Sequence, residues 1–387
     1  MKILHAIPSV ARIYGGPSTA VAALAAAQNR LPEIVAEVAA TDADGDGRFD
    51  PSSWPNEAGK LHLFPTVAGP GASLRAWLDK RIADYDVMHI HSLWNSVVYY
   101  ARRAAVRRGI PIVLRPCGMM SDYTWSRRPL LKYGYWWLRE RGDVSSSAAI
   151  HCTSDAEAAE VRGHKVVRGT IQVIPNGVES AAFTVPRTAG ELRRRVGSMA
   201  DGKRLLLFLS RLHPKKGIVD LLLPALAAIG SNSVLAIAGG PDIHAPGHDD
   251  EIRTAIAALG LTDRVAMLGN IEPAERWSLF DDADAFVLPS HSENFGIVVA
   301  ESMARGCPIL VTSGVQSHEH VSAARAGVVV EPNVGSVLEG LKALAGMDRE
   351  DAAKRSRDYA AQHFDWNRIA ERTIAMYESI IPARANP

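Results

Sequence analysis

The stretch from Leu288 to Pro308, LPSHSENFGIVVAESMARGCP, decides the fold that we expect for this chain. Its apolar start predicts the end of a buried strand, and the rest predicts a polar turn and a short helix that begins at about Gly296. Glu293 falls in the turn, whereas Glu301 falls in the helix, on the face that also carries Ile297. Both carboxylates can therefore contact one ligand, and the free N–H groups of the helix start favour an anion such as a diphosphate beside them.

The composition is that of a globular protein with more than one domain. The chain has 387 residues, which is too long for one ordinary domain and long enough for two that each bury a core. Hydrophobic residues make up 47% and charged residues 22%, which excludes a disordered chain. The formal net charge of +1 excludes a globally basic protein that binds nucleic acid.

The cysteines and the ends of the chain give no sign of secretion or membrane insertion. Cys117, Cys152 and Cys307 stand far apart, so we expect neither a zinc site nor a disulfide framework. The start, Met1–Pro8, lacks the apolar core and cleavage site of a signal peptide, and no apolar run reaches the ~20 residues that span a bilayer. We therefore expect a cytoplasmic protein.

Short apolar runs alternate with helical segments along the chain, which favours parallel sheets covered by helices on both faces. The expected strands are Ile3–Ile7, Val87–His91, Ile112–Arg115, Ala149–Cys152, Ile171–Ile174, Leu205–Leu209, Val234–Ala238, Val265–Leu268, Ala285–Leu288, Ile309–Val311 and Gly327–Val330. The turn Pro175–Val178 separates two halves. We expect domains at 1–180 and 181–365, and a last amphipathic helix over 366–387.

A basic loop follows one of the expected strands. It runs from Ser210 to Gly217, reads SRLHPKKG, and precedes a helical run. It therefore lies at a strand's carboxyl end, where ligands bind in open α/β sheets. Fixed cations there can neutralise the charge that builds on a departing nucleotide diphosphate, in place of a divalent ion. The alternative is a basic loop that is simply solvated.

Two glycine pairs also stand where expected strands end. Gly239 and Gly240 close a strand of the second half, and Gly15 and Gly16 join the first strand to a helix expected to begin near Ser18. Glycine lets the backbone approach a ligand closely, and a helix start offers N–H donors to phosphate or sugar oxygens. The alternative for each pair is a plain turn.

His89 and His91 share one face of their strand, but only His91 reaches its carboxyl end. The alternative for such a histidine is a satisfied polar group in the core. Further along, the segment 123–141 mixes cations with aromatic residues such as Trp136 and Trp137. This mixture suits anionic lipid headgroups, so one hypothesis places the segment on a membrane surface. The alternative is an amphipathic helix that packs its tryptophans inward.

Two aspartate clusters imitate metal sites. Asp42–Gly47 follows the start of a calcium loop, but its twelfth position is Ser53 rather than glutamate. Asp282 and Asp284 form an Asp-x-Asp pattern, but they precede the strand Ala285–Leu288, and ligands are expected at the strand's other end. We therefore expect no metal site.

Taken together, these motifs resemble one family. With seven residues between them, Glu293 and Glu301 resemble the Glu-x7-Glu signature of the retaining glycosyltransferases of family 4 (group 1), which adopt the GT-B fold. Ser210–Gly217 is similar to that family's basic motif, Tyr14–Ser18 to its glycine loop, and Asp86–His91 to its Asp-Val-x-His-x-His segment. The resemblance implies an α/β protein of GT-B architecture. In that fold, two Rossmann-like domains have parallel sheets that face across a cleft, and the C-terminal helix crosses back to the first domain.

The resemblance also implies a role for each matching residue. Arg211 and Lys216 would bind the diphosphate, Glu301 the ribose hydroxyls, Glu293 the sugar and His91 a sugar hydroxyl. The donor site would further include Gly15, Gly16, Gly239, Gly240, Asn294, Phe295, Gly296 and Ile297, and the candidates for acceptor binding are Arg115, Tyr123 and Trp125.

The activity that the resemblance implies is that of a retaining hexosyltransferase that uses a nucleoside diphosphate sugar and needs no cofactor or metal ion. The acceptor would be a glycan or a lipid-linked sugar, in the synthesis of bacterial surface polysaccharide such as lipopolysaccharide, in the cytoplasm or at the inner face of the membrane. Cys117 stands where the family often has histidine or arginine, so a charged acceptor contact is missing there. The alternatives are a nucleotide-sugar epimerase or hydrolase, and a non-catalytic module that binds nucleotide sugars.

Overall fold

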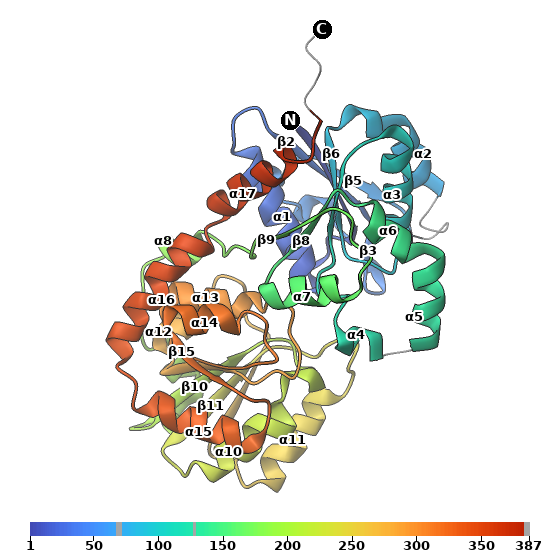
Figure 1. Cartoon of the computed structure of the whole chain (residues 1–387). Helices are drawn as coiled ribbons and strands as arrows, with labels where there is room; N and C mark the ends of the chain where they lie inside the picture. The colour runs from blue at the N-terminus through green and yellow to red at the C-terminus, as the bar shows by residue number, and fades with distance from the viewer. Residues whose placement is uncertain (67–71, 127–128, 383–387) are drawn as a thin grey trace. The chain divides into compact units, whose positions relative to one another are not determined.

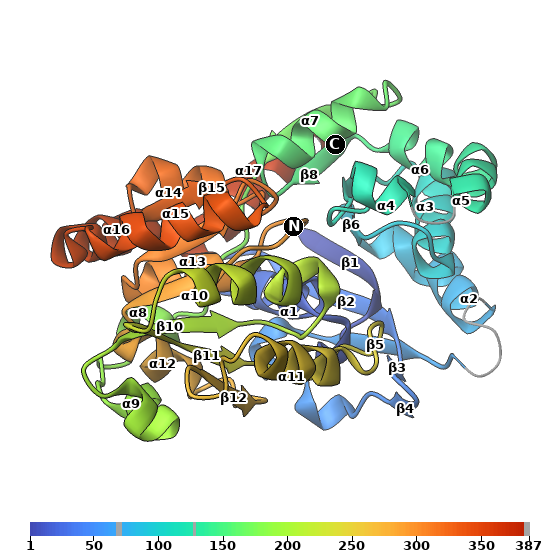
Figure 2. The same ribbon diagram turned by 90° about the horizontal axis from the view of Figure 1, so that it is seen from below.

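The computed structural model describes residues 1–66, 72–126 and 129–382. Every strand expected from the sequence is present in it, and all of these strands pair in parallel. The side chains of Ala72, Asp122, Tyr123, Pro129 and Asp143 lie outside what the structure describes. The chain divides into two compact units (Figures 1 and 2). Unit 1 comprises Met1–Gly177 and Trp366–Pro387, and unit 2 comprises Val178–Asp365.

Unit 1 is built on a seven-stranded sheet with the order β5-β2-β1-β6-β7-β8-β9. Its strands are β1 (Lys2–Ser9), β2 (Val35–Thr41), β5 (Leu61–Phe64), β6 (Val87–His91), β7 (Ile112–Arg115), β8 (Ala149–Cys152) and β9 (Thr170–Val173), while β3 (Ala43–Asp44) and β4 (Gly47–Arg48) pair separately. The strand order reverses direction between β1 and β6, and in open α/β sheets ligands bind beyond the carboxyl ends at such a switch point.

Helices cover both faces of this sheet (Figure 1). They are α1 (Gly16–Asn29), α2 (Ala72–Arg81), α3 (Ser96–Arg108), α4 (Asp122–Ser126), α5 (Pro129–Tyr135), the π-helical segment η5 (Trp136–Glu140), α6 (Arg141–Ser146), α7 (Asp155–Gly163) and α17 (Trp366–Glu378). α1 begins earlier than expected, because Pro17 fits the first turn of a helix, where its missing N–H is not needed. α17 packs against α1, so the C-terminal helix returns to unit 1.

Two strands of the seven-stranded sheet, β2 and β5, are not predicted by the sequence pattern, and a charged residue explains why β2 is not. Glu37 interrupts the apolar run of this strand, although its carboxylate is only 12% exposed. It accepts hydrogen bonds from the Tyr85 hydroxyl at 2.5 Å and from His62 at 2.8 Å, and it pairs with Lys2 at 3.3 Å. Burial alone would raise the pKa of Glu37, but these three partners lower it to about 2. The charge is therefore satisfied by residues distant in sequence.

Unit 2 is built on a six-stranded sheet with the order β12-β11-β10-β13-β14-β15. Its strands are β10 (Arg204–Leu209), β11 (Ser233–Ala238), β12 (Val265–Gly269), β13 (Ala285–Leu288), β14 (Ile309–Thr312) and β15 (Gly327–Val330). Its α-helices are α8 (Ala181–Thr184), α9 (Glu191–Val196), α10 (Leu223–Ala228), α11 (His248–Ala258), α12 (Arg276–Asp282), α13 (Ile297–Arg305), α14 (His318–Ala324), α15 (Val334–Ala345) and α16 (Arg349–His363). The switch point of this sheet lies between β10 and β13.

Candidate functional site

The carboxyl ends of β10 and β13 bring together the basic loop and the first of the two signature glutamates. Lys216, from the loop after β10, forms an ion pair with Glu293, from the turn after β13. Nζ of Lys215 lies 3.9 Å from the same carboxylate oxygen, Oε2 of Glu293. The Lys216 side chain is 6% exposed and the Glu293 side chain 19%, so the pair is largely withdrawn from water.

The lysines keep Glu293 ionised. Burial alone would raise the pKa of Glu293, but the charges of Lys216 and Lys215 outweigh burial and lower that pKa to about 2. The site therefore holds a fixed anion between fixed cations at neutral pH. Charges that are already in place require little reorganisation when a transition state develops charge beside them.

Arg211 is held by a residue that sequence reasoning missed. Its Nη1 donates to Oδ2 of Asp242 at 2.8 Å. The Asp242 side chain is 2% exposed, whereas that of Arg211 is 40% exposed, so a buried carboxylate anchors a cation that an anion can reach. Asp242 follows the glycine pair at the carboxyl end of β11. Its position after a strand end is the one feature of the sequence that could have indicated a role in the site.

Glu301 lies on α13 and has its own partner. Its Oε1 is 3.1 Å from Nη2 of Arg276, and the same Nη2 lies 2.9 Å from Oε1 of Glu179. Burial raises the pKa of Glu301 to about 6, against the opposing charge of Arg276. Nothing in the sequence pattern indicated Arg276, which begins α12 and reaches Glu301 only through the fold.

The turn before α13 has the geometry expected of it. Gly296 is the N-cap of α13, with a φ of 68° in the left-handed region that favours glycine, and Ile297 opens the helix. Asn294 and Phe295 lie in the turn, and the backbone of Glu293 makes hydrogen bonds of 2.9 and 3.0 Å to the loop after β14. Phe295 is buried in the core of unit 2, and a donor contact at this residue stays a prediction.

Gly239 and Gly240 are explained by contacts within unit 2. A Cβ on Gly239, whose φ is 146°, would lie 1.9 Å from the carbonyl oxygen of Ser210, and a Cβ on Gly240 would lie 2.1 Å from Oδ1 of Asn270. The glycines therefore allow the loops after β10, β11 and β12 to approach one another. A donor contact at these positions stays a prediction.

In unit 1, the predicted residues stand at the ends of β1, β6 and β7. Gly15 is the N-cap of α1, with a φ of 90°, and Gly16 is the first residue of that helix. His91 ends β6, is fully buried, and has its Nε2 2.9 Å from Nδ1 of His5. Its Nδ1 has no hydrogen-bond partner among the residues that the structure describes. The alternative of a satisfied core histidine therefore holds for one ring nitrogen only.

The described candidates for acceptor binding, Arg115 and Trp125, are held by contacts within unit 1. Arg115 is 3% exposed and donates to Oδ1 of Asn176, so it supplies an internal charge. Trp125 packs edge-to-face against Trp136, with ring centroids 5.4 Å apart. The side chain of Tyr123 lies outside the described residues. An acceptor role for these residues stays a prediction.

The Asp-x-Asp pattern has a structural task. Asp282 accepts from the backbone N–H of Arg193 at 2.7 Å, and Asp284 accepts from its side chain at 2.9 Å. Asp284 also accepts from the backbone N–H of Leu205 at 2.7 Å. Both carboxylates precede β13 and tie α9 and β10 to the amino end of that strand, away from the loops described above.

Two family models match the chain, one in each unit. A model described as glycosyl transferases group 1 matches residues 191–363, and a model described as a glycosyl transferase 4-like domain matches residues 15–177. The chain belongs to the group 1 glycosyltransferases. The resemblance seen in the signature motifs is thereby confirmed, and the protein is a transferase.

Curated relatives agree with this assignment. The D-inositol 3-phosphate glycosyltransferase of Acidothermus cellulolyticus is 27% identical over 349 residues, which cover 85% of this chain and 74% of the relative. An uncharacterized glycosyltransferase of Methanocaldococcus jannaschii is 30% identical over 216 residues, which cover 54% of each chain.

Solved structures share the fold of this glycosyltransferase. Anabaena HepE in complex with UDP and glucose has a TM-score of 0.76 at 20% identity, over 98% of this chain and 100% of HepE. Sucrose-phosphate synthase from Thermosynechococcus elongatus has a TM-score of 0.75 at 18% identity, over 99% and 100%. WaaG, a glycosyltransferase involved in lipopolysaccharide biosynthesis, has a TM-score of 0.69 at 17% identity, over 99% and 100%. The expected GT-B fold is confirmed.

Proposed function

We propose that this group 1 glycosyltransferase moves a hexose, with retention and without a metal ion, from a nucleoside diphosphate sugar to a hydroxyl of a glycan or lipid-linked sugar. The observation that carries the proposal is the buried pair of Lys216 and Glu293, with Arg211 on the same loop, at the switch point of the unit 2 sheet. The HepE structures hold UDP or UDP-glucose, which supports a donor of this class.

Each residue then has a defined task. Arg211 and Lys216 bind the diphosphate. Arg211 is partly exposed and is anchored by Asp242, and Lys216 pairs with Glu293 in the turn before α13, a helix start that favours an anion. Glu293 accepts hydrogen bonds from sugar hydroxyls as a carboxylate. Glu301 accepts from the ribose hydroxyls, and Arg276 orients it. His91 hydrogen-bonds a hydroxyl of the transferred sugar.

The chemistry is a displacement on one face of the sugar. The bond between C1 and the phosphate oxygen breaks, and its electron pair passes to the diphosphate, whose charge Arg211 and Lys216 neutralise. The acceptor oxygen forms the new bond to C1 from the same face, and its proton passes to the departing phosphate oxygen. Glu293 is paired with a lysine, which favours a holding role over that of a covalent nucleophile. The likeness to WaaG supports a product in bacterial surface polysaccharide.

The experiment that tests the function is a panel of nucleotide sugars, each with and without a chelator. We expect one of them, UDP-glucose being the first to try, to raise the melting temperature and to give transfer to a glycan acceptor that the chelator does not abolish. Glu301→Gln should lose about tenfold in donor affinity, because a neutral amide accepts weaker hydrogen bonds than a carboxylate. Glu339→Gln, an exposed glutamate of unit 2, is the matched control.

The outcomes of the panel separate the alternatives. Release of free sugar without transfer, or formation of an epimer, would replace the transferase with a hydrolase or an epimerase. Loss of transfer with the chelator would contradict metal independence. Binding without any turnover would point to a silent binding module.

A second feature of unit 1 favours a membrane-bound acceptor. Around α5 and η5, five large apolar side chains are exposed, namely Leu130 (88%), Leu131 (70%), Tyr133 (56%), Trp137 (67%) and Leu138 (84%). Trp136 is buried, so the alternative of inward-packed tryptophans holds for this residue and not for Trp137. The guanidinium of Arg141 lies over the Trp137 ring at 4.7 Å, and that of Arg139 lies over Tyr99 at 4.6 Å.

We therefore propose that this patch, defined by the five exposed side chains, rests on an anionic lipid surface and brings the enzyme to a lipid-linked acceptor. Apolar side chains with arginines at their edge are the combination that binds such surfaces. α5 lies at the outer side of unit 1 (Figures 1 and 2). Within the described residues, no helix combines the length and the apolar character that crossing a bilayer requires. Arg127 and Arg128, which also belong to the predicted segment, lie outside the described residues.

Flotation with vesicles of equal parts phosphatidylglycerol and phosphatidylcholine tests the patch. We expect binding that salt weakens and that Leu131→Ser with Leu138→Ser reduces at least tenfold, on the scale of about 1.5 kcal/mol or more for each buried leucine. Leu259→Ser, which changes an exposed leucine of unit 2, is the control. Equal flotation of both variants, or none by the wild type, would refute the membrane surface.

A further inference from the structure

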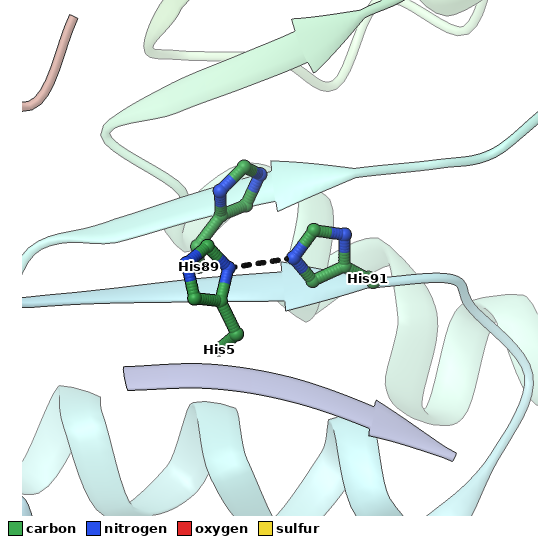
Figure 3. A group of neighbouring side chains, drawn as sticks. All are labelled: His5, His89 and His91. Carbon is green, nitrogen blue, oxygen red and sulfur yellow. Dashed lines mark hydrogen bonds between the residues drawn. The ribbon is translucent and has the colours of Figure 1, made fainter. Parts of the chain in front are cut away.

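Four histidines of unit 1 form a buried network beneath α1 and α17. His5 lies in β1, His89 and His91 lie in β6 (Figure 3), and His151 lies in β8. All four are 1% exposed or less. The mechanism proposed above uses only His91. The hydrogen bonds of the others determine which nitrogen of each ring carries the proton.

The position of each ring proton follows from the carbonyl group of Ile174, because a carbonyl oxygen can only accept a hydrogen bond. Nε2 of His151 lies 2.8 Å from the carbonyl oxygen of Ile174, so Nε2 carries the proton and Nδ1 is bare. Nε2 of His89 lies 3.4 Å from that bare Nδ1, and a hydrogen bond there requires the proton on Nε2 of His89. Nδ1 of His89 is then bare, and it accepts from the Tyr377 hydroxyl at 2.7 Å.

The next bonds orient the amide of Gln28. Because the Tyr377 hydroxyl donates its hydrogen bond to His89, the Tyr377 oxygen accepts a hydrogen bond from the Gln28 amide nitrogen at 3.1 Å. The Thr373 hydroxyl donates to the carbonyl oxygen of Ala370 at 2.8 Å, so it too accepts from the Gln28 amide nitrogen, at 3.0 Å. Both amide protons of Gln28 therefore point to α17, and its carbonyl oxygen faces Nε2 of His5 at 2.8 Å.

The last bond fixes the state of His91. Because Nε2 of His5 donates to Gln28, Nδ1 of His5 is bare and accepts from Nε2 of His91 at 2.9 Å (Figure 3). Nδ1 of His91 is then a bare acceptor, and it is the ring nitrogen for which the described residues offer no partner. A buried acceptor without a donor is costly, and a ligand hydroxyl would relieve that cost.

We propose that Gln28 and Tyr377 are positioning residues that hold His91 in the tautomer with a bare Nδ1, so that this atom accepts a hydrogen bond from a hydroxyl of the donor sugar. The role of His91 toward the sugar rests on the proposed function, whereas the tautomer rests on the network alone. Burial is the main cause that lowers the pKa of His91, and the nearby charge of Arg115 adds to it, so the ring stays neutral and the acceptor is preserved.

The network also decides against a metal ion at the same place. Ligand atoms of His5, His89 and His91 all lie within 4.8 Å of one another, as in a three-histidine site. Hydrogen bonds nevertheless occupy every ring nitrogen of the three except Nδ1 of His91. A metal ion would have to displace several of these bonds, whereas a hydroxyl displaces none.

The test measures tautomers by NMR of protein with 15N-labelled histidine, without substrate. We expect the wild type to show His5, His89, His91 and His151 as neutral rings with the proton on Nε2. Gln28→Leu should turn His5 and His91 into mixtures of tautomers and lower kcat at least tenfold, with little change in the affinity for UDP. Thr373→Val is the control, because Tyr377 still orients the Gln28 amide.

Several outcomes would overturn the proposal. These are a proton on Nδ1 of His91 in the wild type, unchanged tautomers in Gln28→Leu, or a shift of all three clustered histidines on addition of zinc alone. The wild-type spectrum answers the question even if a variant fails to fold. Absence of transfer with every nucleotide sugar would refute the proposed function. The NMR spectra would still show whether Gln28 and Tyr377 set the tautomer of His91, because they are recorded without substrate.

Discussion

Lys216→Ala is expected to lower kcat/KM for transfer by about a thousandfold, the scale seen when a preorganised group that stabilises charge is removed. The side chain is 6% exposed and pairs with Glu293, so the variant loses the cation beside the diphosphate and also leaves a buried carboxylate without its closest partner. Breaking a buried pair in this way costs on the order of 3 kcal/mol of stability. Transfer kinetics and urea unfolding measure the two effects separately.

Two variants separate catalysis from folding. Lys215→Ala removes the neighbouring cation, whose Nζ is 3.9 Å from Glu293 and whose side chain is 25% exposed, and should change kcat/KM much less. Lys216→Ala combined with Glu293→Gln removes both charges and should recover much of the stability but none of the activity. A fully active Lys216→Ala, or a larger loss in Lys215→Ala, would show that the roles of the two lysines are wrongly assigned.

The strands were predictable wherever their apolar runs were continuous. β10, β11 and β13 are read directly from the sequence because both faces of a parallel sheet are buried. β2 was hidden because Glu37 stands inside it, and the partners of this charge come from β1, β5 and the loop before β6. A local pattern cannot reveal charges that are satisfied at long range.

The same limit applies to the site. The motifs placed Arg211, Lys216 and Glu293 at the carboxyl ends of expected strands. The sheet order makes β10 and β13 neighbours, so these ends adjoin. The sequence did not reveal that Asp242 anchors Arg211 or that Arg276 pairs with Glu301. These partners depend on where loops and helix starts meet in space, and no spacing along the chain encodes them.

The histidine network is the extreme case of this limit, because it joins residues from opposite ends of the chain. His5 and His91 are 86 positions apart, and Gln28 and Tyr377 are 349 positions apart. Alternation along β6 placed His89 and His91 on one face, but their partners come from neighbouring strands, from α1 and from the returning α17. Because the network forms only in folded unit 1, the stability of this unit should depend on pH.

Unit 1 is expected to lose stability steeply as the pH falls from 6.5 towards 5. Burial, with the nearby charge of Arg115, lowers the pKa of His5 from 6.5 to about 4 and that of His151 to about 3, and it lowers those of His89 and His91 well below 6.5. Between the folded and unfolded pKa values, the unfolded chain binds protons that the folded chain does not. Each such histidine therefore contributes about 1.4 kcal/mol of stability per pH unit, which is present above pH 6.5 and is lost as the pH falls.

Urea unfolding followed by tryptophan fluorescence measures this loss, because seven of the eight tryptophans belong to unit 1. His151→Gln should lower the slope of unfolding free energy against pH by about one histidine's share, about 1.4 kcal/mol per unit, whereas His244→Gln, which changes an exposed histidine of unit 2, should leave it unchanged. Glu301 acts in the opposite sense, because its pKa is raised to about 6 and the folded form binds the extra proton, but it lies in unit 2. Stability of unit 1 that stays level from pH 6.5 to 5 would mean that these rings bind protons in the folded state as readily as in the unfolded chain, which would contradict their lowered pKa values.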